Sequence, residues 1–580
     1  MRMTNKIMRN NSAYNINQNK ILQDKLTNQM TTQSKIVRPS DDPVVAIRAL
    51  RLRSNVTTVT QYNDKNVRDA DQWLTLTADA MKSVDEVLKD LYKQCTTSAN
   101  KYETADDLKI LMSQMKKLTA EFYSCANVDY AGRFVFSGYR TDLPVTFTEE
   151  DMKEMKDHPV SYNIDESFGF QDISRINYTN YDKLGENLNG NATGTGPATA
   201  PGITDDKSYE QSVSNNTMYR FRISYNNIDS LSGKDMAGNQ RELNFTMPDG
   251  MKVTVKANLD AGGNAQYDTD GNLMITTSAV DAQGNPVAAA QIPQVMEFSD
   301  QEAAYKAIAD GTCTGIAFIP TSGEMVFSKD FYEKNFNEAA FNNSKTGFQV
   351  NYDKSAWKNG DINPVHYFRC VETKNIAAPG DTPELRKTAY NTQRDEGRTQ
   401  DIYYDVGYNQ QIKVNTRADE IFTHDVQRDM DDFEHYLKQY EDIETLQKDL
   451  ETKQKEAAQQ YGEDSEQYKD YGKRLEGVKK AWTYIRDNIH TKFENQISKY
   501  QKYMDDSRVA MTDNATRGSR LTLIKTRLTN QQATYKELQE DNEGIDITEV
   551  AIEMTSADLT YNAALMATGK IMQTNLMNYI

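Results

Sequence analysis

Long stretches of helical apolar spacing at both ends of the chain most constrain its fold. Between residues 475 and 504 apolar residues recur at intervals of three and four, which predicts one face of a coiled-coil helix. The same spacing predicts helices over residues 1–37, 43–99, 108–122, 524–538 and 550–572. Such helices cannot bury their apolar faces alone, so they must pack on each other or on neighbouring subunits.

Residues 141–404 have a different character and predict a β-rich insertion. Alternating patterns predict strands and hairpins at residues 220–225, 242–257 and 317–328. Pro248-Asp249-Gly250 predicts the turn of one hairpin, and the turn residues of 190–206 predict a loop. We therefore expect an α+β fold: an elongated helical bundle or coiled-coil stalk built from both termini, carrying a β-rich inserted outer domain.

The C-terminal helical part contains one addition to this plan. Residues 436–506 predict an extra antiparallel helical hairpin, because Gly462, Glu463 and Asp464 mark a turn inside it. The pattern fits a solvated spine as well as a contact with a neighbouring subunit. The polar break at 541–546 then precedes the last helix.

The segment RPSDDPVVAIRA (38–49) contains several residues that end one helix or begin another. Pro39 disfavours helix at the residue before it, so the first helix should stop there. Ser40, Asp41 and Asp42 can each cap a helix N-terminus, and Pro43 suits the first helical position. We expect a connector between two helices, followed by an apolar stripe that begins at Val44, Val45, Ile47 and Leu50.

Composition excludes several classes of function. With 67 basic and 85 acidic residues the net charge is -18, which disfavours nucleic-acid binding because little would neutralise phosphates. No apolar run approaches the length of a membrane span, and no apolar segment follows the basic N-terminal residues, so we expect no cleaved signal peptide. The charge is uneven: residues 1–60 carry +7 and residues 521–580 carry -4, so the two ends can pair.

No pattern of catalytic or metal-binding residues stands out. The four cysteines and five histidines show no metal-ligand spacing, and no nucleophile, phosphate-loop or paired-carboxylate motif is recognisable. YDTDGNL (267–273) superficially resembles a calcium loop but lacks the full spacing of acidic residues, so a turn between strands is expected. We expect no catalytic, cofactor or metal site.

Three segments carry a resemblance to the flagellin superfamily. They are RPSDDPVVAIRA (38–49), GRFVFSGYRTDLPVTF (132–147) and the terminal residues 545–580. The opening MRMTNKIM is similar to the start of that family, and residues 400–422 resemble its return from variable region to stalk. Within the superfamily the motifs resemble most the hook-associated proteins at the junction of flagellar hook and filament.

The resemblance implies a division into layers. Residues 1–38 and 545–580 would form the inner terminal-helix layer, D0, and residues 39–140 with 405–544 the helical stalk, D1. Residues 141–404 would be a D2-like variable domain, longer than the family pattern. The segment Pro39, Ser40, Asp41, Asp42 and Pro43 would connect the two inner layers.

A second motif would close the N-terminal half of the stalk layer. Its residues are Gly132, Arg133, Phe134, Phe136, Gly138 and Tyr139. Phe134 and Phe136 should face one side of a strand and pack on the helices, as core residues rather than ligand contacts.

The resemblance also implies a function and partners. The chain would be a structural protein of the bacterial flagellum, an adapter ring of neighbouring copies between the preceding hook-associated protein and flagellin. It would leave the cell through the flagellar type III apparatus without a cleaved signal, and an export chaperone would bind its C-terminal helix. We expect assembly or chaperone contacts at Val550, Met554, Tyr561, Leu565, Ile571 and Leu576.

Two alternatives stay open. Flagellins share the stalk plan, so the chain could be a filament subunit. The β-rich insertion could instead house an adhesive or enzymatic domain on a filament protein.

Overall fold

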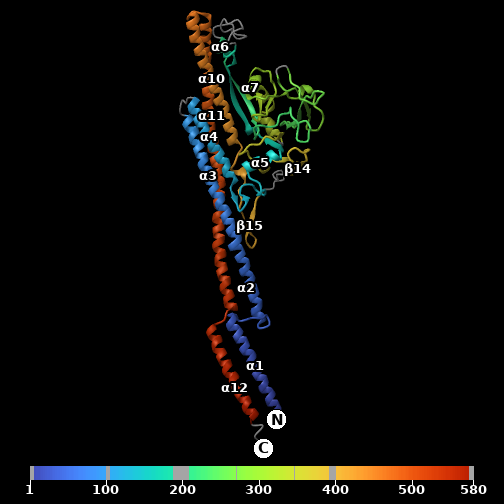
Figure 1. Ribbon diagram of the computed structural model, residues 1–580, viewed down its shortest axis with the longest axis vertical. Coiled ribbons are helices and arrows are strands. Elements are labelled where there is room, and N and C mark those ends of the chain that lie inside the picture. Colours follow the sequence, from blue (N-terminus) through green and yellow to red (C-terminus); the bar gives the residue numbers. More distant parts are fainter. Residues whose placement is uncertain are drawn as a thin grey trace. The chain divides into compact units, whose positions relative to one another are not determined.

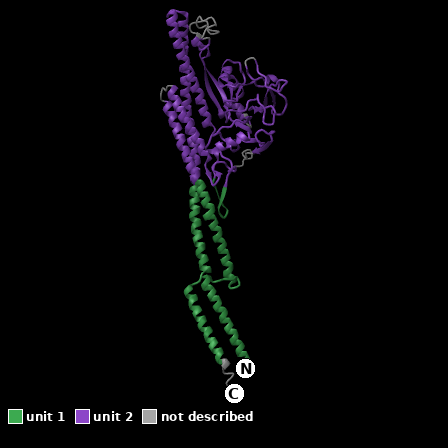
Figure 2. Ribbon diagram, viewed as in Figure 1, with its two compact units in different colours: residues 1–74, 403–414, 516–580 green, residues 75–402, 415–515 purple. Residues whose placement is uncertain are grey.

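The computed structural model describes residues 5–99, 105–186, 188, 208–268, 271–344, 347–390 and 400–573. The chain has an α+β fold, as predicted, and falls into two compact units (Figure 2). Unit 1 comprises residues 1–74, 403–414 and 516–580, and unit 2 comprises residues 75–402 and 415–515. The predicted loop at 190–206 and the predicted helix break at 101–104 lie outside the described residues.

Unit 1 is built from helices of both chain ends. Helices α1 and α12 lie side by side (Figure 1). The unit also holds a π-helical turn at Tyr62–Val67 that follows α2, and a small hairpin of β15 and β16. The elements are α1 (Asn5–Thr32), α2 (Pro43–Gln61), α12 (Ile547–Gln573), β15 (Tyr403–Gly407), β16 (Gln410–Lys413) and the unit 1 parts of α3 (Arg68–Ala99) and α11 (Glu466–Glu543).

Unit 2 contains the remaining long helices. Its helices are the rest of α3 and α11, α4 (Ala105–Ser124) and α10 (Asp425–Tyr461). Gly462, at φ 85°, ends α10 at the predicted turn. The predicted stripe on α11 is intramolecular core, because Val478, Ile485 and Phe493 are buried. The structure begins the first hairpin helix at Asp425 and continues the second without a break to Glu543, so both exceed residues 436–506.

The rest of unit 2 is a sandwich of two β-sheets. The five-stranded sheet has the order β4-β5-β11-β10-β9 and the seven-stranded sheet the order β14-β13-β3-β12-β6-β7-β8. Only β9 and β10 pair in parallel within these two sheets as described. The predicted hairpins at 242–257 and 317–328 are confirmed as β6–β7 and β10–β11.

The sandwich strands and the small elements have the following bounds. The strands are β3 (Val160–Phe168), β4 (Ile173–Asn180), β5 (Ser214–Arg222), β6 (Glu242–Thr246), β7 (Lys252–Ala257), β8 (Ile275–Val280), β9 (Val295–Glu297), β10 (Ile316–Ile319), β11 (Glu324–Ser328), β12 (Phe348–Lys354), β13 (Arg369–Asn375) and β14 (Leu385–Tyr390). The short helices are α5 (Glu149–Asp157), α6 (Ser208–Ser212), α7 (Gln301–Ala309), α8 (Lys329–Asn335) and α9 (Glu338–Asn343), and β1 (Asp129–Tyr130) pairs with β2 (Arg133–Phe134).

Alternating burial explains why the two sheets stack. On β3 and β12 every second side chain is buried, and these side chains meet those of β5 and β11 in one apolar core. Phe221 of β5 lies at its centre, with its ring stacked on Phe348 at 4.4 Å between centroids. The opposite face of the seven-stranded sheet carries the polar half of the alternation.

A buried ionic network joins the sandwich to the helices α10 and α11. Arg220 of β5 contacts Asp432 and Glu324, each at 2.6 Å. Arg222 and Lys499 contact Asp429 at 2.9 and 2.8 Å. Burial alone would raise the pKa of the Asp429 carboxyl, but the surrounding cations hold that pKa well below its usual range. The predicted extra hairpin therefore packs against the insertion.

The calcium-like sequence at 267–273 ends in a tight turn, as predicted. The Asn272 backbone N–H donates to Asp268 Oδ1 at 2.8 Å, with Gly271 at φ 84°. The Asp-x-x-Gly-Asn pattern recurs at Asp235, Asp260 and Asp281 with the same contact from the Asn backbone to the Asp carboxylate. Across the described residues, no group of three or more His, Cys, Asp or Glu could hold a metal ion.

Candidate assembly surface

The connector between α1 and α2 is held by its own acidic side chains. Asp42 caps α2, since its Oδ1 accepts from the Val44 and Val45 backbone N–H groups at 3.0 and 3.1 Å. Pro43 occupies the first helical position, as predicted. Asp41 instead stabilises the loop, because its carboxylate accepts a hydrogen bond from the Arg38 backbone N–H at 2.9 Å. This hydrogen bond lowers the pKa of the Asp41 carboxyl. Pro39 and Ser40 are exposed.

The second connector, between α11 and α12, lies against the first. Ser34 and Gly544 form an isolated antiparallel bridge, and the Lys35 N–H donates to the Glu543 carbonyl at 2.7 Å. The Arg53 Nε also donates to the Glu543 carboxylate, at 2.8 Å. The predicted pairing of the basic N-terminal and acidic C-terminal ends is therefore confirmed at this ion pair.

The helix pair α1 and α12 has a very small core. Its fully buried apolar side chains, within the described residues, are Leu26, Val550 and Ala557. Met554 packs against them, and elsewhere Gln23 donates to Asp558 across the pair. A contact surface this small stabilises a helix pair only weakly, since most helical stability in proteins comes from tertiary packing.

The large apolar side chains of this pair point outward instead. On α1, residues seven apart are exposed: Ile7 by 48%, Tyr14 by 64% and Ile21 by 55%. On α12 a matching series follows the same spacing: Ile552 is exposed by 67%, Leu559 by 69% and Met566 by 73%. Spacing of seven places each series on one face of its helix. We call these six residues the outward stripes.

Some of the predicted contact residues of α12 face α1, whereas others are exposed to solvent. Val550 is buried and Met554 half-buried against α1, so these two serve the pair itself. Tyr561 is half-buried, and Leu565 is exposed by 43%. Ile571 lies in α12, but its side chain is not among those described, and Leu576 lies outside the described residues. Sequence reasoning missed Ile552, Leu559 and Met566, although their spacing of seven was readable.

The stripe at the start of α2 is also exposed. Val44, Ile47 and Leu50 are each more than half exposed, whereas Ala46 and Ala49 are buried. The small alanine side chains form the packed face, and the larger ones face solvent. The stripe is thus a further apolar surface of unit 1, not a contribution to its core.

The GRFVFSGY motif forms a hairpin, but its strand is shorter than expected. Ala131 and Gly132, both at positive φ, form the turn between β1 and β2, and β2 ends at Phe134. Phe134 is half-buried while Phe136 is fully buried, so the two do not share one strand face. The expected single face is wrong, because the strand stops before Phe136.

Phe136 is a core residue, as predicted, and connects to helix α4 through Phe422 in the loop before α10. Its ring meets Phe422 edge-on at 5.2 Å between centroids, and Phe422 meets Phe122 of α4 at 5.3 Å. Gly138 has φ 64°, a backbone conformation that strains other residues, and the Gln400 side chain lies beside it. Tyr139 is exposed, and Arg133 lies over the Tyr130 ring.

Comparison with known proteins identifies the N-terminal part of the chain. Residues 3–141 match the family model of the bacterial flagellin N-terminal helical region. This segment is therefore similar to the N-terminal region of bacterial flagellins, and the resemblance to the flagellin superfamily is confirmed there. No helix among the described residues combines the length and apolar character needed to cross a membrane.

Two curated proteins are similar to part of the chain. Flagellar hook-associated protein 3 of Escherichia coli is 29% identical over 126 residues, which is 22% of this chain and 39% of that protein. Flagellar hook-associated protein 3 of Salmonella typhimurium is 25% identical over 143 residues, 24% of this chain and 45% of that protein. The chain thus spans less than half the length of the curated relatives it matches.

A solved structure is also similar. The crystal structure of flagellar hook-associated protein 3 from Legionella pneumophila is 9% identical, covering 84% of this chain and 98% of that one. Its TM-score is 0.21.

Proposed function

We propose that the chain is a structural component of the bacterial flagellum that forms an adapter ring at the hook–filament junction. Neighbouring copies form the ring, which links the preceding hook-associated protein to flagellin. The similarity of residues 3–141 to flagellins, together with the partial similarity of the chain to hook-associated protein 3, supports this role. The proposal involves no catalysis and no cofactor.

The outward stripes of α1 and α12 carry the proposal. A helix on the surface of a monomeric protein normally turns its apolar face toward the rest of the protein and its polar face toward water. Here Ser12 and Asn19 are more buried than Tyr14 and Ile21, which inverts that pattern. Contiguous exposed apolar surface marks an interaction site, and helices from neighbouring subunits would cover it.

The layers named from the sequence follow from this role. Residues 1–38 and 545–580 would form the inner layer, where subunits contact each other most closely. Residues 39–140 and 405–544 would form the stalk, and residues 141–404 would lie outermost. Before assembly the C-terminal helix would need cover during export, which an export chaperone would provide. The working location would be the flagellum, outside the cell.

A filament subunit is the alternative with support of its own. The matching family model describes flagellins, and residues 3–141 alone do not separate flagellins from junction proteins. The two roles differ in where the protein lies along the flagellum and in its copy number.

Immunogold electron microscopy of intact flagella, with antibody against residues 141–404, tests the proposal. We expect gold in one narrow band where hook meets filament. Pre-immune serum on the same flagella is the control for antibody specificity. Gold along the whole filament would overturn the junction role and make the chain a filament subunit.

A further inference from the structure

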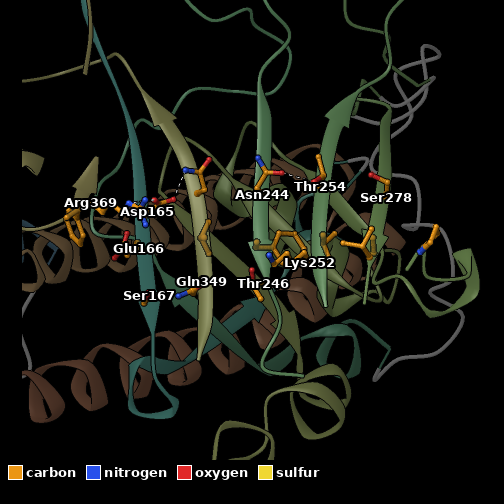
Figure 3. Close-up of a pocket in the computed structure, with 18 of the residues that line it drawn as sticks. Asp165, Glu166, Ser167, Asn244, Thr246, Lys252, Thr254, Ser278, Gln349 and Arg369 are labelled. Atoms are coloured by element: carbon orange, nitrogen blue, oxygen red, sulfur yellow. Dashed lines mark hydrogen bonds and ion pairs between the residues drawn. The ribbon is translucent and has the colours of Figure 1, made fainter. Parts of the chain in front are cut away.

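The open face of the seven-stranded sheet forms a groove that the proposed junction role does not use. It encloses about 880 Å³ and is lined by residues of β3, β6, β7, β8, β12 and β13 (Figure 3). This volume is in the range of ligand-binding clefts in proteins. Because the opposite face of the sheet packs in the sandwich core, the groove side chains are the polar half of the strands.

One row of polar side chains crosses six neighbouring strands. The strand register places these residues directly beside one another, and Figure 3 shows Asn244, Thr254 and Ser278 aligned on adjacent strands. The row consists of Arg369, Asp165, Asn351, Asn244, Thr254 and Ser278. At about 4.8 Å between strands it extends over roughly 24 Å.

Hydrogen bonds along the row hold the polar groups in place. Asn351 Nδ2 donates to Asp165 Oδ1 at 2.7 Å, and Thr254 Oγ1 donates to Asn244 Oδ1 at 2.7 Å. A parallel row follows two residues further along the strands, with Gln349 beside Ser167. Fixed side chains lose little conformational entropy when a ligand binds.

The chemistry of the groove favours a neutral ligand rich in hydroxyl groups. Asparagine, serine and threonine side chains both donate and accept hydrogen bonds, as sugar hydroxyls require. The two cations of the groove lining, Arg369 and Lys252, are matched by two acidic residues, Asp165 and Glu166. Arg369 lies 4.0 Å from Asp165, so the groove carries no excess of either charge. A nucleic acid would need more cations. A peptide that adds a strand would need a sheet edge rather than a face.

We propose that this groove binds a neutral oligosaccharide, with its sugar rings laid along the polar row. The length of the row suits an extended chain of several sugars. The proposal does not depend on the junction role, because a sheet face on the insertion can bind glycans wherever the chain is located.

The test uses the full-length protein on an array of neutral and acidic oligosaccharides, followed by calorimetric titration with the strongest neutral glycan. We expect binding to neutral glycans, and at least tenfold weaker binding for Asn351→Leu or Asn244→Leu. Thr254→Val keeps the side-chain shape and should weaken binding by a smaller factor. Thr388→Leu, on β14 of the same sheet but outside the groove lining, is the matched control and should bind like the original chain.

Circular dichroism confirms that each variant is folded before its affinity is compared. If a leucine variant does not fold, the Thr254→Val measurement decides the question. Absence of binding to every neutral glycan, binding to acidic glycans only, or unchanged affinity in folded groove variants would each overturn the proposal.

Discussion

The β-sandwich and the terminal helix pair differ in how they bury their apolar side chains. Among the described residues, the sandwich and the loops around it gather 29 buried apolar residues into one core, whereas α1 and α12 bury three between them. The same pair exposes the six residues of its outward stripes. A region with a complete core can fold within one chain, while a region whose larger apolar side chains stay exposed depends on neighbours for its stability.

The largest expected effect comes from placing charge on the outward stripe of α12. Ile552→Asp combined with Leu559→Asp should abolish incorporation into flagella, because a carboxylate buried at a subunit contact lacks a partner. Immunoblotting of purified flagella measures incorporation. Thr560→Asp, an exposed position on the same helix, is the control and should incorporate normally. Normal incorporation of the double variant would show that this face is not an interface.

On the sandwich side, the buried ionic network should be the most sensitive point. Arg220→Ala leaves Asp432 and Glu324 without their shared cation, and breaking a buried ion pair destabilises by about 3–5 kcal/mol. Urea unfolding of unit 2, followed by tryptophan fluorescence, gives the free energy. Arg175→Ala, an exposed arginine on the neighbouring strand β4, should change it by less than about 0.5 kcal/mol. Equal effects of the two changes would contradict the network's role.

Buried histidines add a dependence on pH that is confined to unit 2. Burial lowers the pKa of His424 to about 3 and those of His366 and His435 to about 4. The unfolded chain therefore binds more protons below pH 6.5, so each histidine reduces stability as the pH falls from 6.5 toward its folded pKa.

His424→Phe isolates this contribution. The ring of His424 lies among Tyr225 and Tyr367, at 4.9 and 4.8 Å between centroids, where phenylalanine fits. We expect the variant to gain stability over the original chain by up to about 1.4 kcal/mol per pH unit between pH 6.5 and 4. Carboxyl groups with raised pKa values contribute equally to the stability of both proteins, so their contribution cancels in the difference. A stability difference that is independent of pH would refute the burial of a neutral His424.

The smallest effect should come from the core of the terminal pair. Leu26→Ala would normally destabilise a folded core by about 2–5 kcal/mol. In the free monomer we expect no change in the unfolding midpoint of unit 2 and only a small loss of helical circular dichroism. Phe221→Ala in the sandwich, at about 3–5 kcal/mol, is the comparison. If Leu26→Ala destabilised the monomer as much as Phe221→Ala, the proposed difference in stability between the two regions would be wrong.

The sequence predicted the helices, the two hairpins and the Asp42–Pro43 helix start, because periodicity and capping are local signals. It did not predict the network of Arg220 and Asp432, whose partners lie 212 residues apart in the chain. It also placed Val550 and Met554 among the six predicted contact residues of α12, although these two face α1. A helix with apolar residues on two sides gives no local indication of which side meets its own chain. The polar row of the groove depends on strand order, which periodicity does not specify.

Amide hydrogen exchange on a verified monomer shows whether α1 and α12 depend on neighbouring subunits for their stability. We expect fast exchange throughout residues 5–32 and 547–573, and slow exchange in β3, β5 and β12 of the same molecules. Slow exchange across both terminal helices in the monomer would contradict this expectation, because the pair would then be stable without neighbouring subunits.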